Sequence, residues 1–302
     1  MRKSLWIFAT IGFALLLDRA GGLLLSKITK DSQFRYSRLY NGEENADILF
    51  VGNSRGLSFY QPYAEEKTGL KTDNLSYNGM PINLAAPLVM DYLDHHQPPK
   101  VLVMDISLID SVRMDNKLAY QFNHYSPYSE RLSVLLKNKF PNDYYAGIVS
   151  HLYRYNSEVF QRTLYYWKKS DKNWLLDRVI SPSLIQDVDN QKLLRFNYDE
   201  KMVAQLAEMV RYAQQKGTRV ELVVNPYYPA FIPKIGNLDT LMADLQAATG
   251  LMVKNFENAV TTTEAFGDYQ HVNKIGAKLY LDKLVEAGVL ETRTGMGLGI
   301  NY

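Results

Sequence analysis

The chain has 302 residues, of which 46% are hydrophobic and 22% charged, with a formal net charge of +2 and no cysteine. This length allows one large domain or two ordinary ones, and the composition is typical of a globular protein. The small net charge and the lack of a long basic block argue against a nucleic-acid partner. The lack of cysteine excludes disulfides, thiolate metal ligands and a cysteine nucleophile.

The first 30 residues carry an apolar run that begins close to the N-terminus. The run covers residues 5–17 and resumes over 20–25, and Asp18 and Arg19 lie between the two parts. A helix over residues 4–25 would be about 33 Å long, roughly the thickness of a bilayer core. We therefore expect a helix that can cross a membrane, with Asp18 and Arg19 at the interface or paired with each other.

Three interpretations of this segment compete: a signal anchor, a cleaved signal peptide, and an amphipathic or buried helix of a soluble protein. No clean small-x-small cleavage site follows the run, which favours an anchor with its juxtamembrane segment over residues 1–30. Because the run lies so near the start, we expect a cytoplasmic N-terminus. Residues 31–302 would then form an extracytoplasmic domain, in the periplasm or at the cell surface.

Short apolar runs and helical patterns alternate through this domain. The alternation predicts a mostly parallel sheet covered on both faces, an α/β architecture of the flavodoxin-like three-layer α/β/α type. Strands are expected at residues 46–51, 72–77, 101–104, 220–224 and 251–256, and helices at 83–95, 200–215 and 274–287.

Residues 106–198 break the alternation and are rich in aromatic and polar side chains. We interpret them as a mostly helical insertion between the third and fourth strands. The favoured role is a cap that buries its rings in a small core of its own; the alternative is a substrate-facing surface, since exposed rings stack on sugars. The rings include Tyr120, Tyr125, Tyr128, Tyr144, Tyr145, Tyr153, Tyr155, Tyr165, Tyr166, Trp167 and Trp174.

Two short motifs supply the side chains of serine acyl-transfer chemistry. Ser54 lies in a G-x-S-x-G sequence directly after the first expected strand, where a sharp strand-to-helix turn exposes a hydroxyl. Asp268 precedes His271 by three residues near the C-terminus. The structural alternatives are a glycine-rich turn with a serine cap, and a helix-start cap beside a surface histidine. Together the motifs predict Ser54 as nucleophile, His271 as base and Asp268 as the carboxylate that orients the imidazole.

The order of these motifs resembles the SGNH/GDSL hydrolase superfamily. In an α/β-hydrolase the serine elbow follows several strands and the histidine lies far from the acid. Here the serine comes first, and Gly52-Asn53-Ser54 stands where the superfamily has Gly-Asp-Ser. The stretch 268–277 is similar to its D-x-x-H-x-N-x-x-G-A ending. The resemblance covers the predicted sheet and not the aromatic insertion.

The resemblance also implies an oxyanion hole. Asn78-Gly79 resembles the second block of the superfamily, so the amides of Ser54 and Gly79 would face the developing negative charge. The third block normally supplies an asparagine in G-x-N-D, whereas this chain has Met104-Asp105-Ile106-Ser107. Ser107 and Asn78 are the candidates for the third donor.

Three further side chains are candidates for substrate binding. Arg55 directly follows the nucleophile, as a surface salt-bridge partner or as a ligand for an anionic group, and Asn225 and Tyr227 follow the fourth strand at the ligand-binding edge of such sheets. The adjacent His95 and His96 point in different directions, so we expect no shared metal site, and no cofactor is expected.

The expected reaction is acyl transfer through a serine ester. A membrane-tethered SGNH domain with an altered third block resembles the exported partners of membrane-bound O-acyltransferases, which include polysaccharide O-acetyltransferases, among them those of alginate, and the lipoteichoic-acid D-alanylation protein. By that resemblance the protein transfers an acyl group, with acetyl favoured, to or from a cell-surface or exported glycan, beside a membrane-bound O-acyltransferase. The alternatives are a carbohydrate or lipid esterase of the same fold, and an inactive tethered scaffold that binds glycan.

Overall fold

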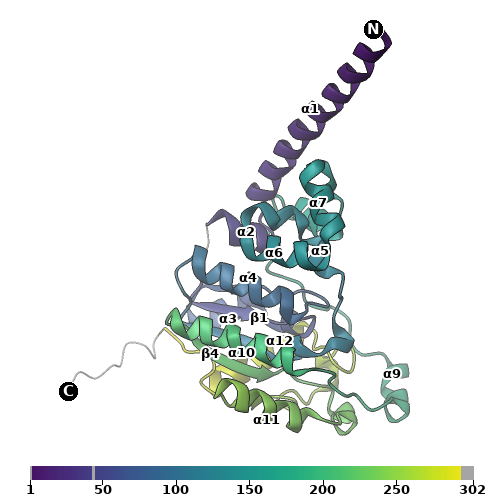
Figure 1. Cartoon of the computed structure of the whole chain (residues 1–302). Helices are drawn as coiled ribbons and strands as arrows, with labels where there is room; N and C mark the ends of the chain where they lie inside the picture. The colour runs from purple at the N-terminus through teal and green to yellow at the C-terminus, as the bar shows by residue number, and fades with distance from the viewer. Residues whose placement is uncertain (1, 43–44, 294–302) are drawn as a thin grey trace, which may run out of the picture. The chain divides into compact units, whose positions relative to one another are not determined.

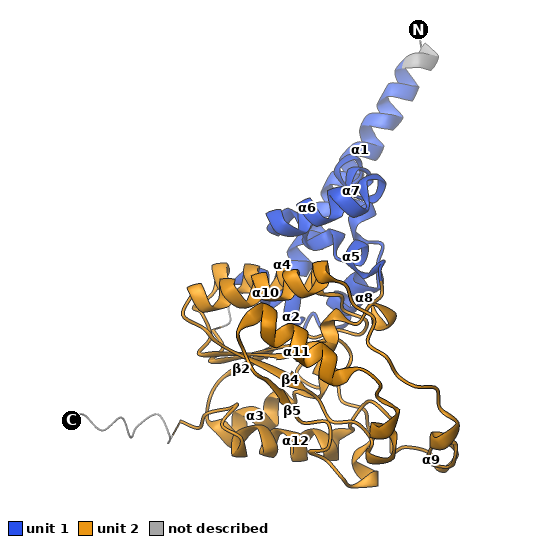
Figure 2. Ribbon diagram, turned by 60° about the horizontal axis from the view of Figure 1, so that its bottom comes forward, with its two compact units in different colours: residues 1–43, 116–171 blue, residues 44–115, 172–302 orange. Residues whose placement is uncertain are grey.

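The structure is a computed structural model that describes residues 2–42 and 45–293. The chain divides into two compact units, shown in Figure 2: unit 1 contains residues 1–43 and 116–171, and unit 2 contains 44–115 and 172–302. These limits do not coincide with the expected boundaries at residues 30, 106 and 198. The middle of the aromatic insertion joins the N-terminal helix, whereas both ends of the insertion belong to the unit that contains the sheet.

Unit 2 is built on a five-stranded parallel sheet with the strand order β2-β1-β3-β4-β5. The expected α/β class with a parallel sheet is therefore confirmed. In register, Ile48 of β1 pairs with Thr72 of β2 and Val101 of β3. The strands are β1 (Ile48–Val51), β2 (Thr72–Asn74), β3 (Val101–Asp105), β4 (Arg219–Val224) and β5 (Val253–Asn255).

The second strand is shorter than the expected 72–77, because Asn74 ends it. The Asn74 side chain accepts a hydrogen bond from the Ser76 amide (2.9 Å) and donates to the carbonyl oxygens of Gly56 (3.0 Å) and Phe59 (3.2 Å). An asparagine that bonds the backbone two residues on forms a turn in place of a strand. This turn leads the chain directly to Asn78 and Gly79.

Helices cover both faces of the sheet, as Figure 1 shows. On one face lie α4 (Ile82–His95), α10 (Glu200–Gln215) and α11 (Leu238–Thr249), and on the other α3 (Gln61–Thr68) and α12 (Lys274–Glu286). The expected helices at 83–95, 200–215 and 274–287 are confirmed within one residue, whereas α3 and α11 were not expected. The spacing of the buried Leu238, Leu241 and Leu245 is a helical signal for α11. Helix α3 buries only Ala64 among its apolar side chains, so its pattern is weak.

Unit 1 is helical and packs an aromatic core of its own. Tyr36, Phe122 and Tyr125 are fully buried, and the Tyr36 and Phe122 rings meet edge to face at 4.7 Å. In the same unit the buried Asp171 carboxylate binds Arg35 Nε (2.9 Å) and Arg38 Nη1 (2.8 Å). The helices are α1 (Arg2–Asp31), α2 (Arg35–Asn41), α5 (Leu118–Gln121), α6 (Glu130–Lys139), α7 (Pro141–Val149) and α8 (Glu158–Tyr165); α9 (Pro182–Asp187) belongs to unit 2.

Helix α1 has the expected character. Over Leu5–Asp31 it is long and apolar enough to cross a membrane, a property that a signal sequence shares. Every side chain from Leu5 to Leu17 is exposed. In the second half of the helix, Gly22 and Thr29 are buried against other parts of unit 1.

The Asp171 cluster yields the first prediction. Burial acts to raise the pKa of Asp171, but the charges and hydrogen bonds of Arg35 and Arg38 lower it below the ordinary 3.8. We expect Asp171→Ala to destabilise the protein by about 3–5 kcal/mol, because two buried guanidinium groups lose their carboxylate. Thermal unfolding in detergent at pH 7, with the exposed Asp239→Ala as control, measures the difference.

The sign of the pH dependence follows from the lowered pKa. The carboxylate contributes its stability above the ordinary pKa and loses it as the pH falls through the folded pKa. The gap in melting temperature between wild type and Asp171→Ala should therefore narrow below pH 4. A gap that is constant from pH 7 to pH 3 would contradict an ionised, buried Asp171.

Candidate active site

Ser54 lies on the tight turn between β1 and a 3₁₀ helix, η1 (Arg55–Ser58). The turn requires glycine because it packs closely against its neighbours: a Cβ on Gly56 would lie 2.4 Å from Ser76 Oγ. Ser54 itself adopts helical φ and ψ at the cap position and is partly exposed. The glycines of the G-x-S-x-G sequence thus bring the turn against the sheet edge and leave the serine hydroxyl accessible.

The Asp268 and His271 turn is held by its own hydrogen bonds. Asp268 Oδ1 accepts from the amides of Gln270 (2.9 Å) and His271 (3.0 Å). The helix that follows, α12, is capped instead by Asn273, which accepts from the amides of Ile275 and Gly276. Because Asn273 fills the capping role, the Asp268 carboxylate remains available to the imidazole.

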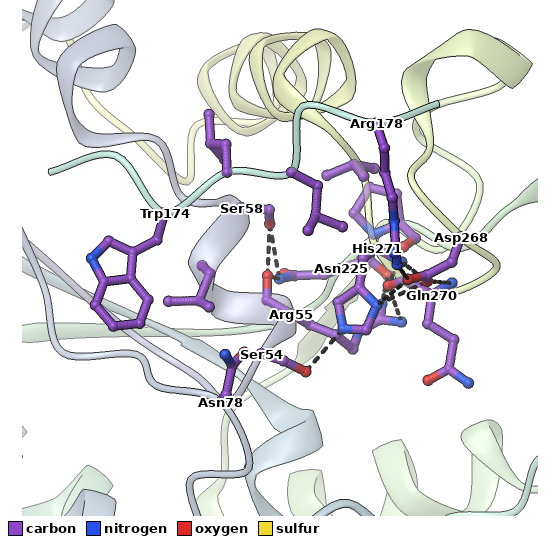
Figure 3. A pocket seen from close by; sticks show the side chains of 15 residues that line it. Ser54, Arg55, Ser58, Asn78, Trp174, Arg178, Asn225, Asp268, Gln270 and His271 are labelled. Carbon is purple, nitrogen blue, oxygen red and sulfur yellow. Dashed lines mark hydrogen bonds and ion pairs between the residues drawn. The ribbon is translucent and has the colours of Figure 1, made fainter. Parts of the chain in front are cut away.

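The structure brings the three predicted catalytic side chains into one line, as Figure 3 shows. Ser54 Oγ lies 2.9 Å from His271 Nε2, and His271 Nδ1 lies 2.9 Å from Asp268 Oδ1. When Nδ1–H donates to the carboxylate, Nε2 carries a lone pair that accepts the serine proton. The serine and the histidine are 217 positions apart in the chain.

Asp268 is held in its ionised form. Partial burial acts to raise its pKa, but the hydrogen bond and charge of His271, together with two backbone amides, lower the pKa to about 2. Arg178 Nη2 lies 3.2 Å from the second carboxylate oxygen. A carboxylate that stays ionised at neutral pH fixes the imidazole tautomer and stabilises the imidazolium.

The candidate oxyanion donors differ in availability. Among the described residues, neither the Ser54 amide nor the Gly79 amide donates a hydrogen bond to another protein group. Asn78 is exposed and lines the same pocket as Ser54. Ser107, in contrast, is buried: its amide donates to Asp105 Oδ1 (3.1 Å) and its hydroxyl to Asp105 Oδ2 (2.7 Å). The amide and the hydroxyl of Ser107 are therefore already bonded within the protein, and Asn78 is the more accessible of the two candidates for the third donor.

Arg55 lines the pocket beside Ser54, but it is buried, which corrects the expected surface salt-bridge partner. Its side chain is 2% exposed and donates to the carbonyl oxygens of Gln270 (3.2 Å), Asn225 and Pro226 (3.3 Å). The guanidinium lies 3.5 Å from the centre of the Tyr227 ring. It thereby joins the turn that carries Ser54 to the loop after β4 and to the loop that carries His271.

Asn225 and Tyr227 are likewise part of this packing. Asn225 is buried, donates to the Arg55 carbonyl oxygen (3.0 Å) and accepts from the Tyr280 hydroxyl (2.7 Å). Tyr227 is fully buried beneath Arg55 and does not line the pocket. Both side chains support the site; Asn225 also lines the pocket, but its side-chain amide is already bonded to Arg55, Ser58 and Tyr280.

A pocket of about 230 Å³ opens in front of the serine. One wall comes from the segment 174–178, which sequence reasoning placed in the insertion without assigning it to the site. The Leu176 carbonyl oxygen accepts from the Lys274 amide (3.1 Å), so this segment runs along the start of α12. No sequence motif assigned this segment to the site, and Trp174 was noted only as one of the aromatic residues of the insertion. It contributes Trp174, Leu175, Leu176 and Arg178 to the lining.

The remaining histidines do not form a second centre. Within residues 2–42 and 45–293, no group of three or more His, Asp and Glu side chains is placed to hold a metal ion. His124 is fully buried in unit 1, and burial lowers its pKa to about 3, so it stays neutral. Comparison with known proteins adds no assignment, since no protein-family model and no curated protein matches the chain.

The burial of Arg55 yields the second prediction. Arg55→Ala leaves three carbonyl oxygens without their donor and removes the stacking on Tyr227, so we expect a loss of about 3 kcal/mol and a melting temperature about 6 °C or more lower. The control is Arg178→Ala, which removes an arginine from the same pocket whose side chain is 66% exposed. Thermal unfolding should separate the two variants; equal, small effects would show that Arg55 does not support the fold.

Proposed function

We propose that the protein is a serine acyl-transfer enzyme of the SGNH type, with Ser54, His271 and Asp268 as its triad. The observation that carries this proposal is the contact of 2.9 Å between Ser54 Oγ and His271 Nε2, in a pocket lined by both side chains. The paired carboxylate at 2.9 Å from Nδ1 completes the arrangement that activates a serine hydroxyl.

In the first step Ser54 Oγ attacks the acyl carbonyl carbon while His271 Nε2 takes the hydroxyl proton. The amides of Ser54 and Gly79, with the Asn78 side chain, stabilise the oxyanion of the tetrahedral intermediate. The intermediate collapses to the Ser54 ester, and His271 returns the proton to the leaving alcohol oxygen. In the second step a hydroxyl group attacks the ester and His271 takes its proton. As the second tetrahedral intermediate collapses, His271 returns that proton to Ser54 Oγ, and the new ester or acid leaves.

The size and lining of the pocket, together with the apolar helix α1, favour a particular class of substrate. A volume of about 230 Å³ is below the range of about 300–1,000 Å³ of sites for drug-sized ligands, which favours a short acyl group such as acetyl. Trp174 offers an aromatic face to a sugar ring in the pocket wall. Helix α1 would tether the enzyme beside extracytoplasmic glycans and a membrane-bound O-acyltransferase that supplies the acyl group.

An esterase of the same fold is the alternative enzyme, because hydrolysis and transfer share the acyl-enzyme. The two differ only in the group that attacks the serine ester in the second step, which is a glycan hydroxyl for a transferase and water for an esterase. With an acetylated reporter ester, a transferase forms acetylated oligosaccharide when a glycan acceptor is added, whereas an esterase releases acetate at an unchanged rate.

Reaction with a fluorophosphonate probe tests the chemistry itself. The wild-type protein should label covalently, and Ser54→Ala should not, because the phosphorus reacts only with the activated serine. Ser58→Ala, a second hydroxyl in the same lining, is the matched control and should still label. No labelling of the folded wild type at any pH from 6 to 9 would favour an inactive, tethered binding protein.

Asp268→Asn tests the role of the carboxylate. An asparagine still accepts the two turn amides through its oxygen, so the fold should persist. The substitution replaces Oδ2, 3.1 Å from His271 Nδ1, with an amide nitrogen, and the neutral amide no longer stabilises the imidazolium that forms when Ser54 gives up its proton. We expect labelling to slow by about 10³–10⁴-fold. The exposed Asp189→Asn should label like wild type; a loss below tenfold in Asp268→Asn would contradict the assigned role.

A further inference from the structure

A helical hairpin of unit 1 exposes an unusual number of apolar side chains beside α1. It consists of α7 (Pro141–Val149) and the 3₁₀ helix η5 (Leu152–Tyr155), and Figure 2 shows α7 alongside α1. Val149, at its tip, is 69% exposed. The other exposed members are Tyr145, Ile148, Leu152 and Tyr153.

The tip of this hairpin binds the charged residue in the middle of α1. Asp18 accepts hydrogen bonds from Ser150 Oγ (2.6 Å), the His151 amide (2.8 Å) and the Leu152 amide (3.1 Å). Arg19 pairs with Asp18 (3.3 Å) and donates to the Val149 carbonyl oxygen (3.1 Å). The carboxylate that interrupts the apolar run therefore faces the hairpin and supplies partners to its backbone.

The opposite face of α1 continues apolar past Asp18. Ala20 is exposed, and Leu23 and Leu24 are 69% and 61% exposed. Exposed apolar side chains thus run from Leu5 to Leu24, about 30 Å of helix, which equals one hydrocarbon core. If the apolar span ended at Leu17, it would measure only about 20 Å and would be too short.

We propose that the α7–η5 hairpin is a second membrane contact, inserted into the lipid interface beside α1 at the level of residues 18–24. Those seven residues span about 9 Å of helix, within the depth of about 5–10 Å at which interfacial segments lie. A turn tolerates lipid only when its polar backbone groups have partners. The His151 and Leu152 amides bind Asp18, and the Ser150 amide donates to the Ala146 carbonyl oxygen (2.8 Å). Tyr145 and Tyr153 suit the headgroup level.

We favour lipid over a protein partner because the exposed apolar side chains of the hairpin continue the exposed apolar run of α1. Because the hairpin tip binds Asp18, its exposed side chains lie at the level where the fully exposed run Leu5–Leu17 of α1 ends, and that run is itself suited to a bilayer. The inference concerns unit 1 alone and does not depend on acyl transfer.

The lack of cysteine permits a direct test with single-cysteine variants of the full chain. Val149→Cys is labelled with an environment-sensitive fluorophore, and the protein is reconstituted into phospholipid nanodiscs with and without lipids that carry a doxyl quencher near the headgroup. Leu23→Cys on α1 is the positive control. Met252→Cys, 72% exposed in unit 2, is the aqueous control.

We expect the Val149 label to be quenched by doxyl lipid at least half as strongly as the Leu23 label, and protected from aqueous iodide relative to the Met252 label. A Val149 label that iodide quenches as strongly as the Met252 label would overturn the proposal. Protection from iodide without quenching by lipid would also overturn it, and would indicate that a protein surface covers the hairpin.

Discussion

The arrangement of the site depends on the buried guanidinium of Arg55. It binds carbonyl oxygens on the loop after β4 and on the loop that carries His271, and it belongs to the turn that presents Ser54. Burial of a charge is costly, and here the cost is offset by these hydrogen bonds, by the Tyr227 ring and by Asp105 at 3.8 Å. A planar group with donors in several directions holds three segments at once, which a lysine ammonium on its flexible stem does less well.

The parallel sheet supplies the frame for this junction. In such a sheet the carboxyl ends of all strands meet at one edge, where ligands bind. Ser54 follows β1, Gly79 follows the turn after β2, and Asn225 follows β4, so all three reach that edge. The chain then returns after β5 to place Asp268 and His271 beside the same serine. The order of the strands thus accounts for how residues at opposite ends of the domain form one pocket.

The candidate site and the apolar N-terminal helix belong to different units. Ser54, His271, Asp268 and every other residue that lines the pocket belong to unit 2. The apolar helix, the hairpin that binds Asp18 and the aromatic core with its Asp171 cluster belong to unit 1. The aromatic insertion is divided between the two: most of its rings belong to unit 1, whereas Trp174 belongs to unit 2 and lines the pocket.

The sequence alone determined the elements whose signals are local. Alternating apolar runs predicted the parallel sheet, the tight glycine turn pointed to Ser54, and the Asp268 and His271 spacing pointed to a single turn. Only the tertiary structure decided which polar residues face the pocket. Arg55 is buried by carbonyl oxygens 170 and 215 positions away, and Asp18 is paired with a turn more than 130 positions away. Burial and hydrogen-bond partnership depend on what the folded chain brings alongside a residue, and no pattern of neighbours in sequence carries that information.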